Sequence, residues 1–72
     1  MGWIRTVNNK ERIIYKRIGH DIKVIIDTPL SNATFGNDYL VRVFHGAILK
    51  ADKTFKKETT AIAHAKKYMR MH

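Results

Sequence analysis

The alternation of apolar and polar residues predicts three strands in the first half of the chain. Each is rich in β-branched and aromatic side chains, and they span residues 3–7, 11–18 and 21–27. Asn8-Asn9 and Gly19-His20 stand between these segments, and both pairs are typical of tight turns. The first half of the chain is therefore expected to form antiparallel hairpins.

The second half of the chain predicts a loop, one or two further strands and a helix. Residues 27–38 hold proline, serine, asparagine and glycine and are expected to form a long loop. Residues 39–45 alternate as a strand, and residues 47–50 can add a last short strand. Only residues 57–71 repeat their apolar positions with a helical period.

This order of elements predicts one α+β domain over residues 1–72. An antiparallel sheet of three to five strands would carry one C-terminal helix packed on one face. On the helix, Ile62, Ala65 and Met69 are expected at the buried centre, with Ala61 and Tyr68 at the flanks. The sheet residues expected beneath them are Ile13, Val24, Ile26, Val41 and Val43. Substitution of such a central residue, Ile62→Ala, is expected to cost roughly 2–5 kcal/mol of stability.

The length of the loop after the second strand decides which side of that strand faces the helix. A two-residue Gly19-His20 turn pairs Lys16 with Lys23 and turns Ile13 and Tyr15 toward the core, with Arg17 near its rim. A three-residue loop would instead turn Ile14, Lys16 and Ile18 inward, and both sides are equally apolar. Turn chemistry favours the two-residue loop, because the longer loop prefers glycine at its last position and the chain has Asp21 there.

The same reasoning places the first strand. If Asn8-Asn9 is also a two-residue turn, Ile4 joins the core, and Trp3 and Arg5 lie on the open face, with Arg5 opposite Arg12. Like charges paired across strands cost a few tenths to about 1 kcal/mol each, and an anionic ligand would reverse that cost. The open face would then combine an aromatic ring with a field of cations, which suits phosphates and stacked bases.

The charge of the chain points to a polyanionic partner. Fourteen Lys and Arg residues against six Asp and Glu residues give a formal net charge of +8. Residues 1–20 hold five basic residues against one acidic residue, and residues 50–72 hold seven against two. This excess is larger than solubility requires.

Catalytic and metal chemistry find little support in the sequence. Ser31 is the only serine, there is no cysteine, and the four histidines have no metal-ligand spacing. Asp52 and Glu58 are assigned to the entry of the helix rather than to acid–base chemistry. We therefore expect a protein that is not an enzyme and has no cofactor and no metal site.

The sequence also bears on location. No apolar run exceeds three residues, so no membrane span or signal peptide is expected, and the lack of cysteine fits the cytoplasm. Residues 1–6 fit a short N-myristoylation pattern, which leaves membrane anchoring by an acyl chain as a minor alternative.

The end of the chain resembles a class of small DNA-binding domains. The residues that carry this likeness are Phe55, Glu58, Ala61, Ala65 and Tyr68. Their spacing resembles the strand-to-helix ending of plant AP2-type and phage integrase arm-binding domains, whose three-stranded sheet enters the major groove. The Arg- and Trp-rich motifs of AP2 domains are absent, so the resemblance assigns no residue a role.

These observations predict a small, non-enzymatic nucleic-acid-binding protein of phage or mobile-element type, with DNA favoured over RNA. The residues expected to contact nucleic acid are Trp3, Arg5, Arg12, Lys16, Lys23, Lys66, Lys67 and Arg70. The alternative is a protein-interaction module, an inhibitor or adaptor, that binds an acidic protein through an exposed patch of Trp3, Ile14 and Ile25. Self-association into a homodimer through an edge strand is a third alternative.

Overall fold

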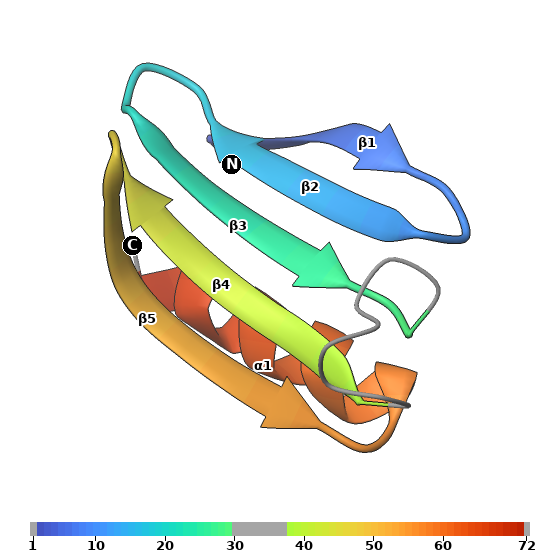
Figure 1. Ribbon diagram of the computed structural model, residues 1–72. Helices are drawn as coiled ribbons and strands as arrows, with labels where there is room; N and C mark the ends of the chain where they lie inside the picture. Colours follow the sequence, from blue (N-terminus) through green and yellow to red (C-terminus); the bar gives the residue numbers. More distant parts are fainter. Residues whose placement is uncertain (1, 30–37, 72) are drawn as a thin grey trace.

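The computed structural model describes residues 2–29 and 38–71 of the chain. Within them lie β1 (Trp3–Asn8), β2 (Arg12–Arg17), β3 (Ile22–Asp27), β4 (Tyr39–His45), β5 (Ile48–Phe55) and α1 (Glu58–Met71). The strands form one antiparallel sheet in chain order, and α1 packs on one face of it (Figure 1). This confirms the predicted α+β fold, and the sheet has five strands, the upper end of the predicted three to five. Of the predicted loop at residues 27–38, residues 30–37 lie outside the described part of the chain.

The core lies between α1 and the central strands. Its buried residues on the sheet are the five expected ones, Ile13, Val24, Ile26, Val41 and Val43. On the helix, however, the fully buried residues are Ala61 and Ala65, whereas Ile62 and Met69 are only partly buried. The predicted burial of Ala65 is confirmed, whereas the central positions of Ile62 and Met69 and the flanking position of Ala61 are wrong. Alanines occupy the point of closest approach because a methyl group lets the helix backbone lie near the sheet.

The register between β2 and β3 is the one predicted from a two-residue turn. Lys16 lies opposite Lys23, and Arg12 lies opposite Asp27. Gly19 has a φ of 80°, a left-handed conformation that favours glycine and that the turn requires. Tyr15 accordingly lies on the helix side together with the core residues.

Strand β5 is longer than predicted and continues through Phe55. Asp52 lies within it, opposite Arg42 on β4, so its assignment to the helix entry is wrong. Glu58, in contrast, is the first residue of α1 and lies in its first turn as expected. The sequence did not predict this length because residues 50–54 are mostly polar and lack the apolar alternation of a strand. Strand β5 forms one edge of the sheet and is exposed to solvent along nearly its whole length.

Strand β1 carries an irregularity that reverses the prediction for its first residues. The turn before β2 is longer than two residues, and the Asn9 side chain accepts backbone hydrogen bonds from Glu11 and Arg12 at 2.8 and 2.9 Å. Between Arg5 and Val7 the pairing with β2 shifts by one residue, which is a β-bulge at Thr6.

A shift of one residue turns every side chain beyond it to the other face of the sheet. Trp3 therefore lies opposite Arg17, and Arg5 lies opposite Tyr15 rather than Arg12. Both are on the helix side, so their placement on the open face is wrong. Ile4 takes the open face instead, where 48% of it is exposed, and its placement in the core is also wrong.

Candidate functional site

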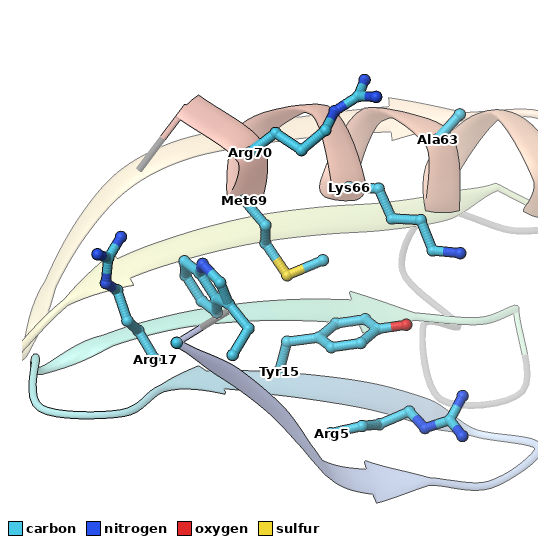
Figure 2. Close-up of a pocket in the computed structure, with 9 residues that line it drawn as sticks. Arg5, Tyr15, Arg17, Ala63, Lys66, Met69 and Arg70 are labelled. Carbon is cyan, nitrogen blue, oxygen red and sulfur yellow. The ribbon is translucent and has the colours of Figure 1, made fainter.

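Helix α1 covers only part of the helix-side face of the sheet. It packs against β3, β4 and β5, while β1 and β2 extend beyond it (Figure 1). The uncovered part and the flank of α1 form an open groove of about 840 Å³ (Figure 2). The groove is lined by Gly2, Trp3, Arg5, Tyr15, Arg17, Ala63, Lys66, Met69 and Arg70.

The floor of the groove alternates aromatic and basic side chains. Trp3 pairs with Arg17 and Arg5 pairs with Tyr15, so the two rings lie on one diagonal and the two arginines on the other. Diagonal neighbours on one face of a sheet lie about 7–8 Å apart, within reach of long side chains. The bulge at Thr6 creates this arrangement, because without it Trp3 and Arg5 would face the other side of the sheet.

The helix supplies the opposite wall of the groove. Lys66 and Arg70 are four residues apart, so they share one side of α1, and the small Ala63 precedes Lys66 by one turn. In Figure 2, Lys66 and Arg5 extend toward one end of the groove together with the Tyr15 hydroxyl, and Arg17 lies at the other end.

None of the four cations of the groove forms an ion pair with another described residue. Within residues 2–29 and 38–71, the ion pairs are Arg12–Asp27, Arg42–Asp27 and Lys56–Asp38, and none of them involves a groove residue. The groove also contains no carboxylate among its lining residues. Four positive side chains around one concave surface create a positive potential that attracts anions.

Two polar atoms beneath the groove are buried without a hydrogen-bond partner among the described residues. They are the indole Nε1 of Trp3 and the guanidinium Nε of Arg17. The Nε of Arg42, on the open face of the sheet, is a third such atom, so they are not confined to the groove.

The open face of the sheet keeps three of the predicted contact residues, Arg12, Lys16 and Lys23. Arg12 is not free there, because its Nε donates to the buried carboxylate of Asp27 at 2.6 Å. Lys23 lies 5.9 Å from the centre of the Phe44 ring, a cation–π contact. The predicted site is therefore divided between two faces of the sheet, and Trp3 does not join Ile14 and Ile25 in one patch.

The helix divides the remaining predicted residues. Lys66 and Arg70 line the groove with Trp3 and Arg5, whereas Lys67 is exposed outside it. Sequence reasoning missed Arg17 and Tyr15 as parts of a site. The predicted register already placed both residues on the same side of β2. It did not indicate a site, because only the bulge in β1 brings Trp3 and Arg5 beside them.

Two histidines lie away from the groove and contact other rings. The Nε2 of His45 is 2.9 Å from the hydroxyl of Tyr68, and His64 lies 5.0 Å from Phe55 between ring centres. Burial, together with the charges of Lys53 and Lys67, lowers the pKa of His64 below its ordinary value of 6.5. Across the described ranges, no group of three or more histidines and carboxylates is arranged for a metal ion. The described residues likewise include no helix long and apolar enough to cross a bilayer.

Comparisons of the chain with protein-family models, with curated proteins and with solved structures found no significant match.

Proposed function

We propose that this chain is a small, non-enzymatic nucleic-acid-binding protein and that it binds through the groove between β1, β2 and α1. The observation that carries the proposal is that four basic residues, Arg5, Arg17, Lys66 and Arg70, line one groove without a carboxylate, with Arg5 and Lys66 extending toward the same end of it (Figure 2). Phosphate contacts of this kind supply most of the affinity of nucleic-acid-binding proteins.

The aromatic floor of the groove favours nucleic acid over other polyanions. Trp3 and Tyr15 are partly exposed and lie between the cations. In such a surface the rings can contact bases while the neighbouring cations contact phosphates. A simple anion has no base and would use only the cations.

A salt titration with short single-stranded and duplex oligonucleotides tests the proposal. If four phosphates are neutralised, the logarithm of the association constant falls with the logarithm of the salt concentration at a slope of about −2.8 for a single strand and −3.6 for a duplex. The duplex slope corresponds to roughly a hundredfold loss of affinity between 50 and 200 mM salt. Absence of binding to both oligonucleotides at 50 mM salt would contradict the proposal.

Two matched pairs of variants locate the binding surface. Arg17 and Lys16 are adjacent on β2 but face opposite sides of the sheet, and Lys66 and Lys67 are adjacent on α1 but only Lys66 lines the groove. Arg17→Gln and Lys66→Gln are expected to weaken binding on the order of tenfold and to reduce the salt slope by about one each. Lys16→Gln and Lys67→Gln remove the same charge and are expected to change affinity much less.

A second candidate function rests on the open face of the sheet. Ile4, Ile14 and Ile25 lie there beside Lys16 and Lys23, so apolar and basic groups adjoin on one surface. Such a surface suits an acidic protein partner that also offers apolar side chains. Capture of one stoichiometric acidic protein at 300 mM salt after nuclease treatment, lost in Ile25→Asp but kept in Arg17→Gln, would favour this function.

A further inference from the structure

We propose that the groove takes a single strand of nucleic acid, with one base stacked in the aromatic floor and the flanking phosphates held at the two ends. This inference deepens the proposed function and rests on it. Two features of the groove support it: the partial exposure of its rings and the separation of its cations.

Stacking requires a ligand whose bases expose their flat faces. In a duplex these faces are covered by neighbouring base pairs, whereas in a single strand they are free to stack on aromatic side chains. Trp3 and Tyr15 lie on one diagonal of the sheet surface, and both are partly exposed. The rings are therefore placed for a ligand that can offer a base.

The cations lie on both sides of the rings. Arg5 and Lys66 extend toward one end of the groove, and Arg17 lies at the other end beside Trp3 (Figure 2). The two phosphates that flank a stacked base would each meet a cation in this arrangement. A free phosphate or a mononucleotide would use only one of the two ends.

The only tryptophan of the chain lies in the groove, so its fluorescence reports on occupancy of the site. The probes are an oligothymidylate of about eight nucleotides, an abasic strand of the same length, and a mixed-sequence duplex of about twenty base pairs that stays paired at 50 mM salt. We expect the oligothymidylate to quench Trp3 and to bind at least tenfold more tightly than either of the other probes. An oligouridylate of the same length distinguishes RNA from DNA by the effect of its 2′-hydroxyl groups.

The outcomes separate this inference from the proposed function. If the duplex binds as tightly as the single strand and Arg17→Gln weakens both, the groove binds nucleic acid but the single-strand inference is wrong. If the abasic strand binds as tightly as the oligothymidylate, base stacking is wrong. If no probe binds at 50 mM salt, the proposed function itself is wrong.

A variant checks the contribution of the floor. Tyr15→Leu keeps an apolar side chain on the sheet but removes the ring, and it is expected to weaken the oligothymidylate about tenfold while leaving the abasic strand unchanged. Equal weakening of both strands would assign Tyr15 a structural role and overturn its role in stacking. Circular dichroism of the variant confirms that it is folded, and the wild-type comparison of the three probes needs no variant.

Discussion

One face of the sheet is divided into two regions of opposite character. Under α1, Val24 and Ile26 on β3 and Val41 and Val43 on β4 are buried together with Ala61 and Ala65 of the helix. On β1 and β2, outside the helix, the same face carries tryptophan, tyrosine and two arginines. The covered region therefore has the apolar composition of a core, whereas the uncovered region combines aromatic and charged side chains.

The difference follows from the dimensions of the elements. A helix of 14 residues is about 21 Å long and, with its side chains, 10–12 Å across. Strands lie about 4.8 Å apart, so one helix covers two or three of the five strands. A sheet of this width therefore leaves parts of β1 and β2 outside the helix, where Trp3 and Tyr15 pack at the edge of the core and stay partly exposed.

The largest effect is expected in the covered region. Ile26→Ala removes a side chain with no exposed surface and is expected to lower the free energy of unfolding by about 2–5 kcal/mol in urea melts. Ile25→Ala, one residue earlier on the open face, is the matched control and is expected to cost clearly less. Equal losses would mean that the open face is packed as tightly as the core.

Larger side chains on α1 test the same difference between the covered region and the groove. Ala65→Leu forces a larger side chain between α1 and the sheet and is expected to cost about 1–3 kcal/mol of stability. Ala63→Leu makes the same change on the groove side, where the residue is exposed, and is expected to leave stability within about 0.5 kcal/mol. Its effect should fall on oligonucleotide affinity, because the larger side chain narrows the groove. Unchanged affinity in a folded Ala63→Leu protein would place the ligand elsewhere.

The edge of the covered region is expected to respond less. Ile62 is only partly buried, so Ile62→Ala is expected to cost about 1–2 kcal/mol rather than the 2–5 kcal/mol predicted for a central residue. Urea melts of Ile62→Ala and Ile26→Ala side by side measure the difference. A loss in Ile62→Ala as large as in Ile26→Ala would restore the predicted centre of the helix face.

The smallest effect concerns pH. Because the pKa of His64 is lowered in the folded protein, the unfolded chain binds more protons in the window just below pH 6.5, and the stability contribution of this group is lost as the pH falls through that window. His64→Gln is expected to reduce the decline in the free energy of unfolding between pH 7 and pH 5.5 relative to the wild type. Parallel stability curves for the two proteins would contradict this account.

The fold was predictable because its signals are local and repeated. The helical period of residues 57–71 and the turn at Gly19-His20 gave the element order, the β2–β3 register and the five buried sheet residues. Each of these depends on neighbours in sequence, which periodicity and turn chemistry describe well.

The composition of the site was only partly predictable. Trp3, Arg5, Lys66 and Arg70 do come together, but they do so because of a bulge at Thr6, which no residue preference in β1 indicates. One extra residue in a strand changes the face of all residues beyond it. Because the prediction lacked this one residue, it placed Trp3 and Arg5 on the open face instead of the helix side. Ile62 was placed at the centre of the helix face and Ala61 at its flank because isoleucine is the more hydrophobic, whereas a close approach of the helix to the sheet requires the smaller side chain.

The strand order has a kinetic consequence. Every strand pairs with its neighbour in the chain, so most contacts form between segments close in sequence, and such folds form quickly for their size. The order also makes the two edges unequal, because α1 packs on β5 as well as on β3 and β4, whereas β1 is held mainly by β2. Amide hydrogens of β1 are therefore expected to exchange fastest among the strands, through opening of the hairpin rather than of the whole protein. Opening of β1 would separate Trp3 and Arg5 from Arg17 and Tyr15 while the pairing of β2, β3, β4 and β5 remains in place.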